Sequence, residues 1–158
     1  MWGSIPSNQS TKYVEVIAMY DLERFYKAQE HDYETALSEI KNGRKESHWM
    51  WYIFPQVAGL GRSAMAGYYA IKGREEARAY IEDPILGKHL VEISEALLKV
   101  KSDQAEEVMG WPDNLKLKSC MTLFAEVAPW QPVFKKVLEK FFDGKMDEKT
   151  LDILEKMG

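Results

Sequence analysis

Apolar residues recur at helical spacing through the second half of the chain, and this pattern constrains the fold more strongly than any other feature of the sequence. After Pro84 an apolar residue returns every three or four positions, at Leu86, Leu90, Ile93, Leu97 and Val100. A second set follows Pro112, at Leu117, Met121, Phe124 and Ala128. Residues three and four apart lie on one face of an α-helix. We therefore expect two amphipathic helices, over 86–100 and 112–128.

The same spacing predicts further helices toward the C-terminus. Six apolar residues between positions 133 and 142 fill one helical face, and that helix should end at Asp143-Gly144. Asp147 can cap a last helix by accepting a hydrogen bond from a backbone N–H in its first turn.

Cap residues indicate shorter helices in the first half. Asp21 can cap a helix over residues 22–29, and Asp32 can cap a second helix that ends before residues 42–43. Ser47 can cap a short helix that must end near Pro55, because proline is not accommodated in a helix interior. Ser63 opens another short helix, and residues 74–82 form one more.

These segments leave no linker long enough to divide the chain into domains. A chain of 158 residues, of which 46% are apolar, can bury one substantial core. The sequence therefore predicts an all-α fold, a single irregular multihelical domain of about eight to ten helices over residues 20–158. Residues 1–19 are expected to form a flexible N-terminal arm.

Several classes of protein are excluded by residue content. Cys120 is the single cysteine, so no disulfide framework can form, and a reducing compartment is indicated. Three scattered histidines and one cysteine argue against a structural zinc site, and we predict no metal and no cofactor. The longest uncharged run, 47–61, contains Pro55, so no membrane span is expected. Without a signal-peptide pattern, the sequence predicts a cytoplasmic, intracellular protein.

Charge is spread unevenly along the chain. The formal net charge is −4, yet residues 41–80 carry seven basic against three acidic residues. Binding to duplex nucleic acid is not expected, because it relies on a broadly basic surface. The basic region leaves room for one local anion site.

An aromatic segment, residues 47–56, is the first candidate site. It runs Ser-His-Trp-Met-Trp-Tyr-Ile-Phe-Pro-Gln and contains the candidate ligand-binding residues His48, Trp49, Trp51, Tyr52 and Gln56. One interpretation is a packed core helix. The other is the aromatic wall of a pocket, with His48 and Gln56 as polar tips, because each indole N–H needs a partner if it is buried. The sequence leaves both interpretations open.

The candidate anion site follows in residues 59–63, Gly-Leu-Gly-Arg-Ser. Gly59 and Gly61 let backbone amides approach a ligand, and Ser63 stands at a helix start. Arg62 can contact a phosphate or carboxylate through two hydrogen bonds. The alternative is a plain glycine-rich connection between helices. The segment also matches a Gly-x-Gly-x-x-Ala dinucleotide fingerprint, but that fold needs flanking parallel strands, which the sequence does not indicate.

A third candidate lies near the start of the 112–128 helix, where Asp113, Lys116 and Ser119 are spaced three residues apart. This spacing places them on one polar ridge. A lysine beside a serine hydroxyl can form a nucleophilic pair, but no oxyanion partner is identifiable, so nucleophilic catalysis is not favoured. We interpret Cys120 as a buried apolar residue and His89 as a surface residue.

Together these segments resemble the family of proteins called domain of unknown function 1810. The resemblance rests on residues 47–56 and 59–63, on Tyr-Ala-Ile at 69–71 and on Asp-Asn-Leu-Lys-Leu-Lys-Ser-Cys-Met-Thr-Leu-Phe at 113–124, and it extends from residue 21 to 154. It implies a compact, all-helical, intracellular protein without an established activity. Members are sometimes labelled calpastatin, for which these residues give no physical basis. Where the family often has His-Pro and Ser-Ser, this chain has Asp83-Pro84 and Ser119-Cys120.

A fainter similarity links the chain to a family proposed to act on ADP-ribose-related N-glycosides. The shared features are a helix of the Phe/Tyr-x-x-Gln type, at residues 25–29, and a Leu-Gly-Arg turn, at residues 60–62. This similarity implies a nucleotide-like ligand, and it assigns no catalytic carboxylate to any position.

Two classes of function follow from these residues. The first is binding of a small anionic ligand, nucleotide-like or ADP-ribose-like, in an aromatic and basic pocket, with hydrolysis as an extension. The alternative is a non-catalytic helical adaptor that holds a peptide or partner protein in an aromatic groove. Single-stranded nucleic acid would use the same aromatic residues, but the acidic balance of the chain counts against it. The sequence names no substrate and no oligomeric state.

Overall fold

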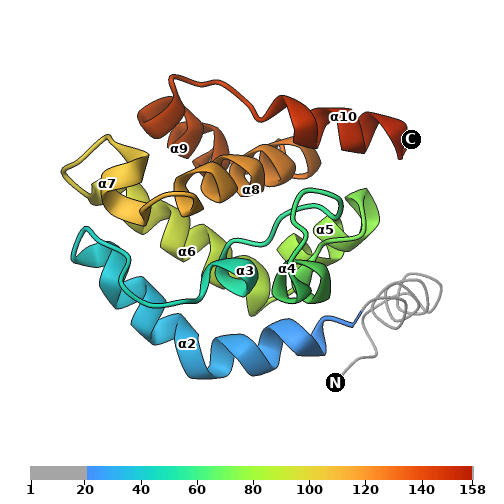
Figure 1. Cartoon of the computed structure of the whole chain (residues 1–158), viewed down its shortest axis with the longest axis horizontal. Helices are drawn as coiled ribbons and strands as arrows, with labels where there is room; N and C mark the ends of the chain where they lie inside the picture. The colour runs from blue at the N-terminus through green and yellow to red at the C-terminus, as the bar shows by residue number, and fades with distance from the viewer. Residues whose placement is uncertain (1–20, 158) are drawn as a thin grey trace, which may run out of the picture.

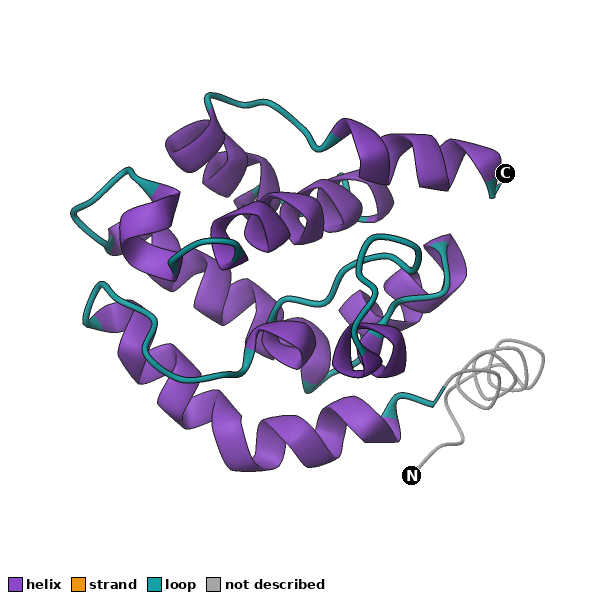
Figure 2. Cartoon of the chain, viewed as in Figure 1, coloured by secondary structure: helices purple, strands orange, loops and turns teal. Residues whose placement is uncertain are grey.

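The structure is a computed structural model that describes residues 21–157, and within that range its regular elements are helices joined by loops, with one isolated β-bridge (Figure 2). Helices account for about two thirds of the described residues, so the predicted all-α fold is confirmed. The predicted arm, residues 1–19, lies outside the described residues. No helix in the described range is both long and apolar enough to cross a membrane.

Helices α6 and α8 occupy the middle of the fold, with α2 along one edge and α9 and α10 along the opposite edge (Figure 1). The helices within residues 21–157 are α2 (Glu23–Lys41), α3 (Met50–Ile53), α4 (Ala64–Tyr69), α5 (Arg74–Glu82), α6 (Leu86–Lys99), α7 (Ala105–Met109), α8 (Asp113–Val127), α9 (Val133–Phe142) and α10 (Glu148–Lys156). Helix α6 packs against α2, α5 and α9, and α8 packs against α5, α7, α9 and α10.

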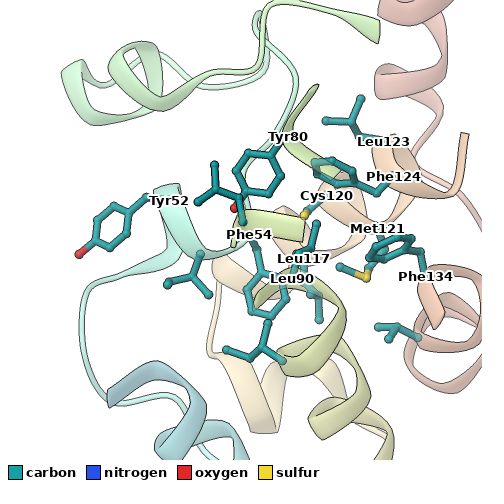
Figure 3. Close-up of a cluster of buried hydrophobic side chains, with 14 of the residues drawn as sticks. Tyr52, Phe54, Tyr80, Leu90, Leu117, Cys120, Met121, Leu123, Phe124 and Phe134 are labelled. Atoms are coloured by element: carbon teal, nitrogen blue, oxygen red, sulfur yellow. The ribbon is translucent and has the colours of Figure 1, made fainter. Parts of the chain in front are cut away.

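The apolar stripes of α6 and α8 form the centre of the core. The helical residues of the first stripe are no more than 1% exposed: Leu86, Leu90, Ile93 and Leu97. Those of the second are fully buried, namely Leu117, Met121 and Phe124, and so is Ala128 directly after α8. Several of them meet in the cluster shown in Figure 3. Burial of each large side chain contributes roughly 1.5–3 kcal/mol, so these two stripes supply much of the folding energy.

Cys120 belongs to the same cluster and is fully buried, as predicted (Figure 3). Burial raises the pKa of its thiol well above the ordinary value. A neutral, shielded thiol is a poor nucleophile, so Cys120 acts as a small apolar core residue.

Three predicted helix boundaries are confirmed. The Ser63 hydroxyl accepts a hydrogen bond from the Ala66 N–H at 3.1 Å and caps α4. The Asp147 carboxylate accepts one from the Thr150 N–H, also at 3.1 Å, and caps α10. Helix α9 ends directly before the predicted stop at residues 143–144.

The prediction of two helices in residues 22–42 is wrong, because α2 runs without a break from Glu23 to Lys41. Asp32, the expected second cap, instead accepts a hydrogen bond from the Tyr52 hydroxyl on α3. The buried face of α2 continues on both sides of Asp32, with Phe25, Tyr33, Ala36 and Ile40. Burial of this continuous face outweighs the weak local preference of aspartate for a helix start.

Glu39, near the end of α2, ties down the connection to α3. Its Oε1 accepts hydrogen bonds from the backbone N–H groups of Glu46 and Ser47, at 2.8 and 2.9 Å, and from the indole N–H of Trp49 at 2.9 Å. The Ser47 hydroxyl donates to Oε2, so Ser47 does not cap a helix as predicted, and α3 begins at Met50. Burial alone would raise the pKa of Glu39, but these hydrogen bonds lower it to about 2.

Replacing Glu39 with glutamine should destabilise the protein by about 1–2 kcal/mol at pH 7, because an ionised acceptor of several hydrogen bonds becomes neutral. The pKa of Glu39 in the folded chain is lower than its ordinary value of 4.5. Its contribution is therefore present above pH 4.5 and is lost as the pH falls toward 2. Free energies of unfolding of wild type and E39Q, measured by urea denaturation from pH 7 to pH 3, should converge at low pH.

Glu30→Gln, an exposed change on the same helix, is the matched control and should shift stability by less than about 0.5 kcal/mol at every pH. A gap between wild type and E39Q that stays constant from pH 7 to pH 3 would contradict the role assigned to the Glu39 carboxylate.

Candidate functional site

A small cavity lies between α3, the loop that follows it and α4. Its volume is about 140 Å³, and its lining comprises Trp51, Gln56, Val57, Ala58, Gly59, Gly61, Ala66, Gly67, Tyr69 and Ala70. Four of these are residues that the sequence predicts for the site: Trp51, Gln56, Gly59 and Gly61. A cavity of roughly 150 Å³ can hold one benzene molecule, so this one has room for a single aromatic ring.

Two half-buried aromatic side chains, Trp51 and Tyr69, contribute to the lining. Tyr69 packs against Phe25 and Tyr52, with ring centroids 5.8 and 5.1 Å apart. Burial raises the pKa of Tyr69, and the neighbouring Tyr68 adds to this, so the phenol is neutral at physiological pH. The indole and the neutral phenol are suited to packing against a planar ligand.

Positive charge gathers beside Trp51. The Lys116 ammonium lies 5.4 Å from the centroid of the Trp51 ring and 3.5 Å from a carboxylate oxygen of Asp113. Lys45 pairs with the same carboxylate at 2.9 Å. Lys45 also lies 4.9 Å from the centroid of the Trp49 ring, whose indole N–H binds Glu39, so Lys116 is the cation that stands over Trp51. The fold therefore brings Asp113 and Lys116 together with Trp51, although they are far apart in the sequence.

The loop 59–63 approaches α4 closely and leaves polar groups free. Gly59 has a φ of 101°, which favours glycine. A Cβ atom at Gly61 would lie 2.5 Å from the Cβ of Ala66. The backbone N–H groups of both glycines have no hydrogen-bond partner among the described residues. The exposed guanidinium of Arg62 is likewise unpaired within residues 21–157, so these groups are available to an anion.

A buried ion pair between Arg24 and Glu76 holds the wall that carries Tyr69. The two residues are 6% and 0% exposed, and their charged atoms are 3.1 Å apart. The Arg24 guanidinium also donates to the carbonyl oxygens of Tyr68 at 2.8 Å and Ala70 at 2.9 Å. Glu76 accepts a hydrogen bond from the N–H of Lys72 at 2.7 Å. The pair therefore fixes the backbone of residues 68–72.

A single β-bridge joins this wall to the other side of the cavity. The N–H of Ile71 donates to the carbonyl of Gln56 at 2.8 Å, and the N–H of Ala58 donates to the carbonyl of Ile71 at 2.7 Å. Val57 and Ile71, both buried, thereby form an isolated parallel bridge. Because the ion pair holds the segment around Ile71, the bridge extends that constraint to Gln56.

Trp49 and Tyr52 belong to the core and not to a pocket wall. Trp49 is 1% exposed, and its indole N–H donates a hydrogen bond to the carboxylate of Glu39 on α2. Tyr52 is also buried; its hydroxyl donates to Asp32 and points away from the central cluster (Figure 3). The pocket interpretation of residues 47–56 therefore applies to Trp51 and Gln56, and the core interpretation applies to Trp49 and Tyr52.

Besides Trp49 and Tyr52, six residues predicted for the site do not line the cavity: His48, Arg62, Ser63, Asp113, Lys116 and Ser119. His48 is exposed, and its backbone carbonyl accepts a hydrogen bond from the Tyr52 hydroxyl at 3.3 Å. Ser119 is buried, and its hydroxyl lies 3.2 Å from the carbonyl of Leu115 and 3.1 Å from the carboxylate of Asp147. The three residues of the expected polar ridge on α8 therefore do not form one site. Ser119 contacts the start of α10, whereas Asp113 and Lys116 lie beside the aromatic segment.

Arg24 and Glu76 are absent from the site that the sequence predicts. Charged residues usually lie on solvated faces, so their presence alone carries no signal. The signal for Glu76 is its position four residues before the buried Tyr80, which puts its carboxylate on the buried face of α5. No such pattern marks Arg24, because the residues outside its own helical turn that it binds lie 44 to 52 positions away in the sequence.

The expectation that His89 lies on the surface is wrong. Its ring stacks on Tyr33 with centroids 3.7 Å apart, and its Nδ1 lies 2.8 Å from Oε1 of Gln29. The amide nitrogen of Gln29 donates to the Tyr52 carbonyl and the Tyr80 hydroxyl, both at 2.8 Å, so Nδ1 of His89 must carry the hydrogen. Burial lowers the pKa of His89. Through Gln29 this network fixes α3 against α2.

The chain belongs to a family of proteins of unknown function, DUF1810, whose model matches residues 19–154. This confirms the resemblance to that family. The chain is also similar to a solved structure, that of the conserved hypothetical protein Rv1873 from Mycobacterium tuberculosis, with 41% sequence identity and a TM-score of 0.84. The similarity covers 86% of this chain and 97% of the other. No curated protein matches the chain, and the similarity to N-glycoside-cleaving proteins stays a prediction.

Replacing Gly61 with alanine should destabilise the protein by about 1–3 kcal/mol, because the new methyl group would overlap that of Ala66 and α4 would have to shift. The free energy of unfolding from urea denaturation measures this loss. Ala66→Gly removes the overlap, so the double variant G61A/A66G should be nearly as stable as A66G alone.

Gly67→Ala is the matched control, because a Cβ atom at that position meets no atom within 4 Å. It should leave stability unchanged or raise it, since alanine favours a helix interior. If G61A is as stable as wild type, or if A66G does not suppress its effect, the close approach of the loop to α4 is not what requires glycine at position 61.

Proposed function

We propose that the cavity beside Trp51 binds a small anionic ligand of the nucleotide-like or ADP-ribose-like class. The observation that carries the proposal is a cavity of about 140 Å³ whose lining includes Trp51, Tyr69 and the glycines of the 59–63 loop. The exposed Arg62 follows the lining residue Gly61 directly in the chain. A planar ring would pack against the two aromatic residues. The attached anionic group would lie toward Arg62.

Electrostatics favour an anion at this place. Arg62 has no partner within the described chain, and the Lys116 ammonium lies 5.4 Å from the centroid of the Trp51 ring. Arginine can hold a phosphate or carboxylate through two parallel hydrogen bonds, which a lysine cannot reproduce. Because these charges are at least partly exposed, binding of the anion should weaken as salt is added.

The residues that line the cavity support binding of the ligand without catalysis. Cleavage of an N-glycoside needs a carboxylate that stabilises positive charge and positions water. Within residues 21–157, the part of the chain that the structure describes, no aspartate or glutamate lines the cavity. Glu76 lies behind the wall that carries Tyr69, but it is paired with Arg24.

The adaptor alternative is favoured by one separate observation. Trp111 is 71% exposed and Leu115, one helical turn later, is 51% exposed. They follow Gly110, which borders an open groove of about 460 Å³ with Arg44 and Glu107 among its lining residues. Exposed aromatic and aliphatic residues next to a groove are typical of protein-binding surfaces. A partner protein would therefore dock on Trp111 and Leu115, neither of which lines the cavity beside Trp51.

An intracellular location is part of the same proposal. It rests on the single cysteine, Cys120, which is buried as a free thiol and forms no disulfide, as is typical of proteins in a reducing compartment.

Thermal denaturation with CMP, ADP-ribose and cytidine tests the proposed function, because the cytosine ring of CMP and cytidine is small enough for the cavity. The phosphorylated compounds should stabilise the wild-type protein, by about 2.7 kcal/mol at 100 times the dissociation constant. Arg62→Ala should change the stability of the free protein by less than about 0.5 kcal/mol, because the side chain is exposed and unpaired. It should nevertheless remove most of the stabilisation by phosphorylated compounds.

Arg44→Ala, at an exposed arginine that lines the other groove, is the charge-matched control and should respond to ligands like the wild type. Trp111→Ala should also respond like the wild type, because the adaptor surface is separate from the cavity. The proposal fails if no compound stabilises the protein, or if R62A and R44A lose the same share of the response.

A further inference from the structure

Among the described residues that line the cavity, Gln56 is the one polar side chain apart from the Tyr69 phenol and the Trp51 indole. Its backbone is fixed, because its carbonyl accepts a hydrogen bond from Ile71 in the β-bridge. The residue is half-buried, and its side-chain amide makes no hydrogen bond to any described residue. A primary amide offers one acceptor oxygen and two donor hydrogens side by side. The cavity therefore contains an unused donor and acceptor pair held by a fixed backbone.

The size of the cavity restricts what this amide can meet. A volume of about 140 Å³ is close to the roughly 150 Å³ that encloses one benzene molecule. A six-membered ring fits within such a space, whereas a two-ring purine extends beyond it. The edge of the bound ring, and not its face, must satisfy the amide, because the faces lie against the aromatic residues.

We infer that Gln56 selects a single six-membered ring whose edge carries a hydrogen-bond donor next to an acceptor, as in a ring carboxamide or an amino-pyrimidine. This inference rests on the proposed function, because it takes the cavity beside Trp51 as the ligand site. In the complex, Oε1 of Gln56 accepts from the amino group of the ligand, and Nε2 donates to the neighbouring oxygen or ring nitrogen. Both partners stay neutral, and no proton is transferred.

The selectivity follows from the cost of an unpaired polar group. A ring of the same shape without the donor displaces water from Oε1 of Gln56 and leaves that oxygen without a hydrogen bond. A site built around a hydrogen bond discriminates against analogues that lack it. Since one net hydrogen bond corresponds to about a tenfold change in affinity, each missing partner should weaken binding by about that factor.

Ligand-observed NMR titration with small neutral rings tests the inference without involving the anion site. The probes are benzamide, which carries the complete edge, acetophenone, which keeps the oxygen and lacks the amino group, cytosine and adenine. Benzamide and cytosine should bind the wild type about tenfold more tightly than acetophenone. Adenine should also bind more weakly than cytosine, because its second ring extends beyond the cavity.

Two variants of Gln56 complete the test. Gln56→Met keeps the length and removes the amide, so benzamide and acetophenone should bind it equally. Gln56→Glu replaces the donors by acceptors, so it should prefer benzamidine, whose edge carries donors only, over benzamide. Gln104→Met, at an exposed glutamine that does not line the cavity, is the matched control and should keep the wild-type order. The melting temperature of each free variant shows whether it is folded.

The outcomes separate the inference from the proposed function. If rings bind but benzamide has no advantage over acetophenone, or if Q56M keeps that advantage, the inference about Gln56 is overturned while the cavity remains a ligand site. If no ring binds to the folded wild-type protein, both the inference and the cavity as a ring-binding site are overturned.

Discussion

The buried ion pair between Arg24 and Glu76 is the interaction on which the candidate site depends. Removing two charges from water costs several kcal/mol per ion, and close geometry with additional hydrogen bonds is needed to offset that cost. The structure supplies those bonds through the carbonyl oxygens of Tyr68 and Ala70 and the N–H of Lys72. All three lie in one segment, 68–72, so the pair determines where the wall of the cavity stands.

Helix α4 shows why such a constraint is needed. None of its residues is buried, so it gains little from the hydrophobic effect, and a six-residue helix has little stability of its own. Its position depends on contacts at its two ends. The Ser63 hydroxyl caps the beginning, and Arg24 binds the carbonyl groups at and after its last turn. Close packing of Gly61 on Ala66 then sets the distance between the loop and the helix.

The fold could be predicted where the sequence contains long apolar stripes. The position of a site residue could be predicted only where its contacts are with residues close to it in the sequence. The stripes of α6, α8 and α9 mark buried faces directly, and Ser63 and Asp147 act on their own helices. Trp49 could not be placed, because its partner Glu39 lies on a helix whose relation to α3 is set by tertiary packing. The same holds for Arg24, Ser119 and His89, whose partners lie on other elements.

Amide hydrogen exchange in a variant without the ion pair tests this dependence most directly. Arg24→Met combined with Glu76→Leu replaces the pair by apolar side chains, which need not destabilise a fold when no charge is left unpaired. The account predicts faster exchange at the bridge amides of Ala58 and Ile71, while core amides such as that of Phe124 keep their wild-type protection. Unchanged protection at Ala58 and Ile71 in the folded variant would contradict it.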